Sequence, residues 1–327
     1  MRFPCYIYKE GRDFRFTPAL QKLKFYPSFL TVENENKTLQ PALEVFVETD
    51  DPQKAHLFLF PFDIGPAIDF NLADEMEQVL ASLPYLPGRA EHHLVTDMAD
   101  RAESVSLKVC LFKVSVTEDS GLEERVVVTG YRTPPYVLCQ KPVWPLKRTR
   151  YDCSFIGANS HFSREAAILS IRQEAPELRF FAQLHDSFVV QGNSFFIKEC
   201  SKEELERRQS VFVRSLHDSI CILCPPGVGP QSVRLYETMC MGRLPVLFDY
   251  KTLYPFPDKI DYSAFALIIP AEKLMHTGAL LKEWLKKHSP EELSQKAVLA
   301  RKVWWDYFSP AQYSRRLLEE AGRKFGF

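Results

Sequence analysis

The sequence predicts an α/β fold in two lobes, each built around a mostly parallel β-sheet. Three observations support this prediction. The chain has 327 residues, more than the roughly 100–200 residues of one ordinary domain. Short apolar runs alternate with amphipathic segments in both halves, which is the pattern of strands and crossover helices. Residues 133–152 contain four prolines and a basic cluster, so they indicate an irregular connector between the halves.

In the first half, apolar runs predict strands and one amphipathic stretch predicts a helix. The helix is expected from Asn71 to Leu83. The expected strands are residues 5–8, 43–48, 56–60 and 93–95, with further sheet within residues 105–116 and 124–130.

The second half shows the same alternation more clearly, because a Gly/Pro loop separates a buried strand from the helix that follows it. The expected strands are residues 152–157, 178–181, 219–224, 244–248 and 266–270, and the expected helices are residues 163–174, 202–216 and 231–241. We therefore expect a first lobe over residues 1–145 and a second lobe over residues 146–303. Residues 304–327 are expected to form a C-terminal helix that crosses back to the first lobe.

The composition is that of a globular protein with a substantial core: 46% of the residues are hydrophobic and 25% are charged. This excludes a disordered chain. The formal net charge is -1, so there is no overall basic field to hold a nucleic-acid backbone. We expect no nucleic-acid partner, and the oligomeric state is left open.

The cysteines are interpreted as small core residues rather than as a disulfide framework. There are eight of them, spread through apolar segments. Cys221 and Cys224 form a C-x-x-C, but no second Cys/His pair stands at zinc-ligand spacing. The sequence contains no signal peptide and no run of the ~20 apolar residues that spans a bilayer. We expect a cytoplasmic protein without an integral membrane segment, or a Golgi-lumenal one if an N-terminal anchor precedes this sequence.

The segment 224–248 carries the clearest chemical signal. Gly227 and Gly229 allow the backbone to approach a ligand closely, and the following helix presents unpaired N–H groups and a positive dipole end to a phosphate. Ser232 is positioned to cap that helix. Arg234 can reach a diphosphate with its planar fork of donors, and Glu237, one turn later, can accept both hydroxyls of a ribose. Phosphate followed by ribose is the order of a nucleotide.

Each of these features also has an ordinary structural interpretation: a tight turn, a helix cap and a surface ion pair. Their combination after a buried strand favours the nucleotide interpretation. The sequence lacks G-x-x-x-x-G-K-[ST], G-x-G-x-x-G and D-x-D, the motifs of other phosphate sites. We therefore expect a metal-independent site in which arginine and a helix dipole balance the phosphate charge.

The same segment resembles the C-terminal signature of the exostosin family: a P-x-G loop, S-x-R-x-x-E, G-x-x-PV and PF before an Asp-aromatic pair. The matching residues are Pro226, Gly227, Gly229, Ser232, Arg234, Glu237, Gly242, Pro245, Val246, Pro255, Phe256, Asp261 and Tyr262. Upstream, Gly157 and Arg164 match the family's F-x-G and following Arg. In the first lobe, Ala55, Phe58 and Pro61 match its A-x-x-F-x-x-P stretch.

This resemblance implies a GT-B fold, in which two Rossmann-like lobes face each other across a cleft, with the donor bound to the second lobe and the acceptor to the first. It implies an inverting glycosyltransferase that uses a nucleotide sugar, usually a UDP-sugar, as co-substrate and a glycan as acceptor, with no resident cofactor. Arg234 and Arg164 would stabilise the leaving diphosphate, and Glu237 would hold the ribose. The remaining donor-site residues would be Gly157, Pro226, Gly227, Gly229 and Ser232.

An inverting transfer also needs a general base. By the resemblance, His93 and Asp100 match the family's base-bearing stretch, with Asp97 and Asp63 as nearby alternatives. The match departs from the pattern by one extra residue between Arg89 and His93, and Ala99 stands where the family has His. We favour Asp97 or Asp100, because one of the adjacent strand residues His92 and His93 must face the core, where a histidine serves a structural hydrogen bond.

Two other classes of function remain as alternatives. A catalytically inactive protein could retain the nucleotide-sugar or glycan site and act as the partner of another transferase. A nicotinamide-dependent oxidoreductase would use a similar sheet, but the sequence lacks the G-x-G-x-x-G fingerprint with an acidic residue about 20 positions later.

Overall fold

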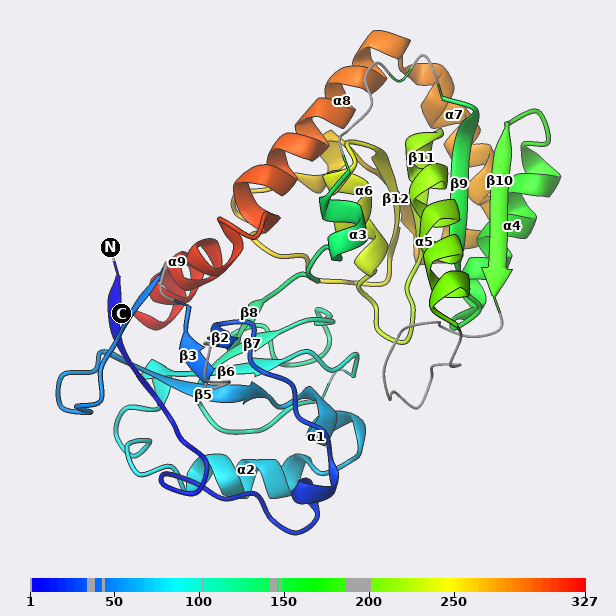
Figure 1. Cartoon of the computed structure of the whole chain (residues 1–327). Coiled ribbons are helices and arrows are strands. Elements are labelled where there is room, and N and C mark those ends of the chain that lie inside the picture. The colour runs from blue at the N-terminus through cyan, green and yellow to red at the C-terminus, as the bar shows by residue number, and fades with distance from the viewer. Residues whose placement is uncertain are drawn as a thin grey trace. The chain divides into compact units, whose positions relative to one another are not determined.

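The computed structural model describes residues 2–33, 39–42, 45–101, 103–140, 146, 149–185 and 201–327. The chain divides into two compact units (Figure 1). Unit 1 comprises Met1–Gly130, Lys251–Phe256 and Pro310–Phe327, and unit 2 comprises Tyr131–Tyr250 and Pro257–Ser309. Unit 2 begins at Tyr131 and ends at Ser309, whereas the sequence boundaries were placed after residues 145 and 303, and the short segment 251–256 belongs to unit 1.

Unit 1 is built on a parallel sheet of six described strands in the order β4-β1-β5-β6-β7-β8. Its strands are β1 (Phe3–Ile7), β4 (Phe46–Glu48), β5 (Leu57–Asp63), β6 (His93–Asp97), β7 (Cys110–Lys113) and β8 (Val126–Val128), and a separate antiparallel pair is formed by β2 (Thr31–Glu33) and β3 (Leu39–Pro41). Its helices are α1 (Gly65–Asp69), α2 (Ala73–Ala81) and α9 (Tyr313–Phe325), with 3-10 turns at Leu20–Lys22 and Ala90–His92.

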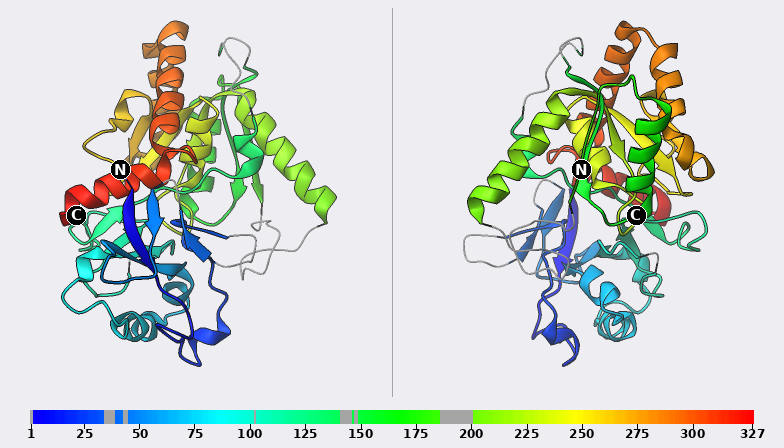
Figure 2. Two further views of the ribbon diagram at one scale, coloured as in Figure 1. Left: turned by 60° about the vertical axis from the view of Figure 1, so that its left-hand side comes forward. Right: turned by 90° about the vertical axis from the view of Figure 1, so that its right-hand side faces the viewer.

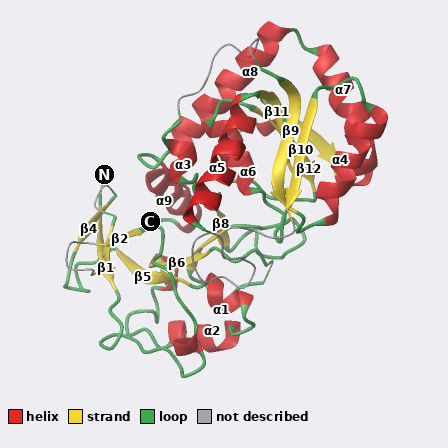
Figure 3. Ribbon diagram, turned by 45° about the vertical axis from the view of Figure 1, so that its right-hand side comes forward, coloured by secondary structure: helices red, strands yellow, loops and turns green. Residues whose placement is uncertain are grey.

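Both faces of the unit 1 sheet are covered, which explains why its strands are almost continuously apolar. On β7, Leu111 belongs to the core that lies under α1 and α2 (Figure 3). The next residue, Phe112, contacts Phe29, which in turn contacts Tyr313 of α9. The Tyr313 hydroxyl also hydrogen-bonds both backbone groups of Gly130, after β8. Helix α9 thus packs on the sheet of unit 1.

Unit 2 contains a parallel sheet of five described strands in the order β10-β9-β11-β12-β13. The strands are β9 (Tyr151–Ala158), β10 (Phe180–His185), β11 (Ser219–Cys224), β12 (Leu244–Asp249) and β13 (Leu267–Pro270). The helices are α3 (Pro135–Leu138), α4 (Phe162–Glu174), α5 (Lys202–His217), α6 (Val233–Cys240), α7 (Thr277–Lys287) and α8 (Pro290–Val303), with 3-10 turns at Tyr262–Ala264 and Ala271–His276 and a π-helical turn at Trp304–Phe308. Helices lie on both faces of this sheet (Figure 2).

The strand order of unit 2 reverses direction beside β9. The chain passes from β9 outward to β10 through α4, and then returns past β9 to β11 and β12 through α5 and α6. Right-handed crossovers therefore place α4 and α6 on opposite faces of the sheet. In such a sheet, ligands bind at the carboxyl ends of the strands where the order reverses, which in unit 2 are the ends of β9 and β11.

The parallel sheets confirm the predicted α/β class, and the strands and helices predicted in the second half are present with shifts of a few residues at their ends. The sequence patterns missed α1, the β2–β3 pair and α3. Helix α3 lies inside the segment expected to be irregular, and it is a single turn that begins at Pro135, a residue compatible with the first turn of a helix. Residues 304–327 were expected to be one helix, but the π-turn ends at Phe308 and α9 begins at Tyr313.

No helix among the described residues combines the length and the apolar character needed to cross a membrane.

Candidate functional site

The predicted donor residues gather at the carboxyl ends of β9 and β11 in unit 2. Gly157 is the next-to-last residue of strand β9, and Arg164 lies in the first turn of α4. The loop after β11 contains Pro226 and Gly229, whose carbonyl accepts a hydrogen bond of 3.0 Å from the Gly227 N–H. The chain therefore brings two strand ends and two helix starts, those of α4 and α6, to the reversal point of the sheet.

Arg164 holds the glycine loop in place. Its side chain is 7% exposed, with Nε donating to the Pro226 carbonyl at 2.9 Å and Nη1 donating to the Ala158 carbonyl at 2.6 Å. The guanidinium thus joins the end of β9 to the loop after β11. It adds positive charge to the site while its donors serve the backbone.

The site glycines make room for arginine side chains. A Cβ at Gly227 would lie 2.9 Å from Nη2 of Arg164. A Cβ at Gly157 would lie 2.8 Å from Cζ of Phe155 and 3.4 Å from Nη2 of Arg234. The sequence suggested that Gly227 admits a ligand to the backbone, but the space beside it holds the Arg164 guanidinium.

Two aromatic rings position Arg234. Its guanidinium lies over the Phe212 ring of α5, at 4.2 Å from the ring centroid, and 5.8 Å from the centroid of Phe155. The Arg164 guanidinium lies 5.7 Å from the same Phe155 centroid. Cation–π contacts of this kind hold a guanidinium without using its hydrogen-bond donors. Phe155 therefore brings both arginines to one place.

Glu237 is a buried carboxylate beside Arg234. It is 3% exposed, and Oε1 accepts a hydrogen bond of 3.4 Å from the Tyr136 hydroxyl. Its Oε2 lies 3.6 Å from Nε of Arg234. Burial raises the pKa of Glu237, and the charge of Arg234 opposes that rise.

Two buried polar atoms of this pair make no hydrogen bond within the described residues: Oε2 of Glu237 and Nε of Arg234. A buried polar group without a partner costs about 1–3 kcal/mol, so such atoms are uncommon unless a ligand or water completes them. Ser232 occupies the N-cap position of α6, but its side chain makes no capping hydrogen bond. The hydroxyl predicted to cap the helix is thus not used for that purpose.

In unit 1, His93 is part of the core. The residue is 1% exposed and its ring stacks on Phe58 with centroids 4.8 Å apart. Nε2 lies 2.7 Å from the Tyr8 hydroxyl, and Nδ1 lies 2.8 Å from the Arg89 carbonyl. Burial lowers the pKa of His93 to about 4. With both nitrogens engaged and the ring buried, His93 does not have the geometry of a general base.

Asp97 is also committed to internal contacts. Its carboxylate and the ammonium of Lys113 form an ion pair of 2.9 Å in which both side chains are 0% exposed. Asp97 further accepts hydrogen bonds from the Ala99 N–H and the Ser104 hydroxyl. Asp63 accepts from the N–H groups of Gly65 and Met98, and burial raises its pKa to about 6. These two carboxylates organise the loops at the carboxyl edge of the unit 1 sheet.

Asp100 is the predicted base that retains partial exposure. It lies just beyond β6 at the same sheet edge and accepts a hydrogen bond of 3.3 Å from the Ser115 hydroxyl. Asp69, at the end of α1, is close enough to be affected by its charge. Partial desolvation of Asp69, together with the Asp100 and Asp97 carboxylates, raises its pKa to about 6, although its side chain remains accessible.

Sequence reasoning missed Tyr136, Phe212 and Asp69, and it included Phe155 only as the aromatic residue of the F-x-G motif. Phe155 and Phe212 lie in a strand and a helix whose apolar patterns explain them as ordinary core residues. Tyr136 lies in the segment expected to be irregular. Asp69 follows β5 by six residues, so its place after a buried strand was the available signal.

The described residues contain no group of three or more His, Cys, Asp or Glu side chains that could hold a metal ion. Cys221 and Cys224 are free and buried on β11, and burial raises the pKa of Cys224 to about 12. Cys139 departs from the expected pattern because it is exposed. Cys200 lies outside the described residues.

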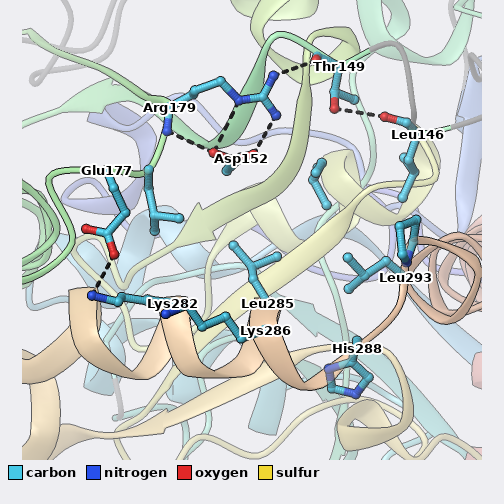
Figure 4. A pocket seen from close by; sticks show the side chains of 13 residues that line it. Leu146, Thr149, Asp152, Glu177, Arg179, Lys282, Leu285, Lys286, His288 and Leu293 are labelled. Atoms are coloured by element: carbon cyan, nitrogen blue, oxygen red, sulfur yellow. Dashed lines mark hydrogen bonds and ion pairs between the residues drawn. The ribbon is translucent and has the colours of Figure 1, made fainter.

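A cavity of about 510 Å³ lies at the opposite, amino edge of the unit 2 sheet (Figure 4). It has an apolar floor that includes Ile220 and Leu285, and its rim carries two ion pairs, Arg179 with Asp152 and Lys282 with Glu177. It shares no lining residue with the predicted donor site.

Residues 1–284 match the family model of the Exostosin GT47 domain. Among solved structures, the chain is similar to TarM, with 10% identity and a TM-score of 0.41, over 74% of this chain and 57% of TarM, which is less than two thirds of that protein. It is similar to a glycosyltransferase from Rickettsia africae ESF-5, with 9% identity and a TM-score of 0.43, over 86% of this chain and 85% of that one. It is also similar to sucrose-phosphate synthase from Thermosynechococcus elongatus, with 9% identity and a TM-score of 0.44, over 90% of this chain and 84% of that one.

No curated protein sequence matches this chain significantly. The family model, by contrast, covers most of the chain, including the glycine loop, Arg234 and Glu237. Its two parallel α/β units are those expected of a GT-B glycosyltransferase, and the chain belongs to the exostosin GT47 family of glycosyltransferases.

Proposed function

We propose that this protein is an inverting glycosyltransferase that moves a sugar from a nucleoside diphosphate donor, a UDP-sugar, to a hydroxyl of a glycan. The observation that carries the proposal is the pair Arg234 and Glu237. Glu237 is buried and Arg234 is largely buried, with 14% of its side chain exposed, at the reversal point of the unit 2 sheet, and each keeps a polar atom without a hydrogen bond within the described residues. A ligand that offers an acceptor to Arg234 and a donor to Glu237 would complete both.

The diphosphate supplies the acceptors. Arg234 lies in the first turn of α6, where the helix also presents backbone N–H groups and its positive dipole end. Arg164 adds a second positive charge through the shared contact with Phe155. As the bond to the sugar breaks, negative charge grows on the diphosphate, and fixed positive groups at that point lower the barrier. Because these groups belong to the chain itself, we propose that catalysis needs no metal ion.

The ribose supplies the donors. Glu237 lies one helical turn beyond Arg234 on the same face of α6. An ionised carboxylate accepts hydrogen bonds only, so two vicinal ribose hydroxyls are well matched to it. The adjacent Arg234 charge favours the ionised form of Glu237 against the effect of burial.

The base is assigned to unit 1. Of the predicted candidates, His93 and Asp97 are buried and occupied by internal hydrogen bonds. Asp100 is partly exposed at the carboxyl edge of its sheet, where ligands of parallel α/β sheets bind. We therefore propose Asp100 as the group that takes the proton of the acceptor hydroxyl.

Release of nucleoside diphosphate tests this function. A panel of nucleotide sugars is incubated with the protein, with and without a sugar acceptor, in the presence and absence of a chelator. Wild type should release UDP from one donor in chelator, and Glu237→Gln, which keeps the size but removes the charge, should lower kcat/KM by about 10- to 100-fold. Glu165→Gln on the solvent side of α4 is the matched control.

Three outcomes would contradict parts of the proposal. Turnover that is abolished by the chelator and restored by a divalent cation would refute metal independence. Turnover with a net retention of anomeric configuration would refute inversion. Binding of UDP without release from any donor would favour the alternative of an inactive binding partner.

A further inference from the structure

We propose that Ser160, His161 and Tyr250 form a subsite that binds the hydroxyl groups of the donor's sugar. This inference rests on the proposed function, because it extends the nucleotide site described above. It adds the part of the site that distinguishes a nucleotide sugar from the nucleotide alone.

Two hydroxyls in this region are buried without a hydrogen bond. Neither Oγ of Ser160 nor the Tyr250 hydroxyl makes a hydrogen bond within the described residues, although the Ser163 side chain lies near enough to Tyr250 to oppose the rise of its pKa that burial causes. As with Glu237 and Arg234, burial of such atoms is costly unless a ligand or water completes them. Ser160 follows β9 and Tyr250 follows β12, so both lie at the carboxyl edge of the unit 2 sheet.

The hydroxyls of Ser160 and Tyr250 lie in one region, which borders the predicted phosphate site. The rings of His161 and Tyr250 meet edge to face with centroids 5.7 Å apart, and Ser160 directly precedes His161. A Cβ added to Gly227 would lie 3.7 Å from Oγ of Ser160 and 2.9 Å from Nη2 of Arg164. Gly227 therefore adjoins both Ser160 and Arg164, and the Arg164 guanidinium also lies 5.7 Å from the Phe155 centroid.

His161 provides a neutral N–H donor. Burial and the nearby Arg164 charge lower the pKa of His161, so its ring is neutral near pH 7. Its Nδ1 accepts a hydrogen bond of 3.3 Å from the backbone N–H of Ser163, at the start of α4, and lies 2.7 Å from the Ser163 hydroxyl. Because Nδ1 is the acceptor, the proton of the neutral ring is on Nε2.

The chemistry of the three groups fits a sugar. Two hydroxyls can each donate and accept, and the imidazole N–H donates, which matches hydroxyls that also do both. A further phosphate would instead call for a free cation, and two donors of Arg164 already serve the carbonyls of Ala158 and Pro226.

The order of the groups also fits a nucleotide sugar. Glu237 contacts Tyr136 and Arg234, Arg234 and Arg164 both contact Phe155, and Gly227 adjoins both Arg164 and Ser160. Ribose, diphosphate and sugar follow one another in the same sequence along the donor molecule.

The test compares two ligands on two variants. Dissociation constants are measured by calorimetry for UDP and for a panel of UDP-glucose, UDP-galactose, UDP-N-acetylglucosamine and UDP-glucuronate, in wild type, Tyr250→Phe and Ser160→Ala. Each variant should weaken binding of the preferred UDP-sugar by about 3- to 10-fold, the effect of one neutral hydrogen bond. Binding of UDP should change by less than about 2-fold, because the hydroxyls do not contact it.

Tyr151→Phe is the matched control, since its ring stacks on Phe181 at the amino end of β9. The unliganded variants should melt at or above the wild-type temperature, because each loses a hydroxyl that makes no hydrogen bond among the described residues.

Three results would overturn the inference. If Tyr250→Phe and Ser160→Ala bind the UDP-sugar as tightly as wild type, the hydroxyls do not bind the sugar. If both variants weaken UDP and UDP-sugar equally, the groups belong to the nucleotide site, and the proposed function stands without the subsite. If wild type binds no UDP at all, the proposed function fails first, and the subsite fails with it.

Discussion

Oε2 of Glu237 lies 3.6 Å from Nε of Arg234, and neither atom makes a hydrogen bond within the described residues. The two charges are close enough to attract one another, yet the geometry leaves both atoms able to bind a third group. The exposed Arg207 and Glu204 pair on α5 differs in this respect, because its atoms meet at 2.7 Å. The longer contact between Arg234 and Glu237 is consistent with the proposal that both bind a donor.

Arg234→Lys should keep the charge but lower kcat/KM for the donor by about 10- to 100-fold, because lysine lacks the planar fork that lies over Phe212. Steady-state kinetics with the preferred donor measures this. Arg208→Lys serves as the control, because Arg208 is an arginine of α5 that is paired with Glu204. A variant with unchanged kcat/KM would show that only the charge of Arg234 matters.

Gly157→Ala should raise KM for the donor by about 10-fold, because the new methyl group would lie 2.8 Å from Phe155 and would displace the ring that positions both arginines. Overpacking of this kind also costs about 1–3 kcal/mol of stability. Gly121→Ala is the control, because it strains a backbone with φ +69° in unit 1. It shows how much a general loss of stability alone changes KM. Equal KM changes in both variants would contradict the role of Gly157.

Lys113→Met should lower the free energy of unfolding by about 3–5 kcal/mol, because it leaves the buried Asp97 carboxylate without its counter-ion. Urea denaturation measures the loss. Adding Asp97→Asn should recover part of it, since the uncompensated charge is then gone. If the single variant is as stable as wild type, the ion pair is not the reason that Asp97 is buried.

His93 should make the protein sensitive to acid. Its folded-state pKa is about 4, against an ordinary value of 6.5, so the unfolded chain binds the proton more readily between these values. The stability that comes from neutral, buried His93 is therefore present above pH 6.5 and is lost as the pH falls towards 4. Between pH 7.5 and pH 5, wild type should lose about 2 kcal/mol more than His93→Gln. Equal losses in urea denaturation would contradict the assignment of His93 to the core.

Asp100→Asn should abolish sugar transfer while UDP binding remains, because the base acts on the acceptor and not on the nucleotide. The substitution also removes a negative charge near Asp69, whose pKa is about 6 through partial desolvation and the Asp100 and Asp97 charges. The pKa of Asp69 should therefore fall, which carbon-detected NMR titration of the side-chain carboxyl measures. Full activity of Asp100→Asn would show that Asp100 is not the base and would make Asp69 the next candidate.

The sequence predicted the second half of the chain well, because its strands and helices are long and their patterns differ. Strand β11 is a continuous apolar run, and α6 begins directly after a Gly/Pro loop. The first half was harder, because strands such as β4 and β8 have only three residues each and pair with distant segments. Short elements gain their stability from tertiary contacts rather than from local pattern.

The sequence by itself determined the α/β class and the family, and it predicted which residues gather at one sheet edge, since a strand, a glycine loop, an arginine and a glutamate follow one another in fixed order. Only the tertiary structure decided what each group contacts. It gave the donors of Arg164 to backbone carbonyls, buried His93 and Asp97 in internal hydrogen bonds, and left Glu237 with an oxygen available. The physical reason is that spacing along a strand or helix fixes where a side chain begins, whereas its charge state and its partners depend on neighbours that are remote in the sequence.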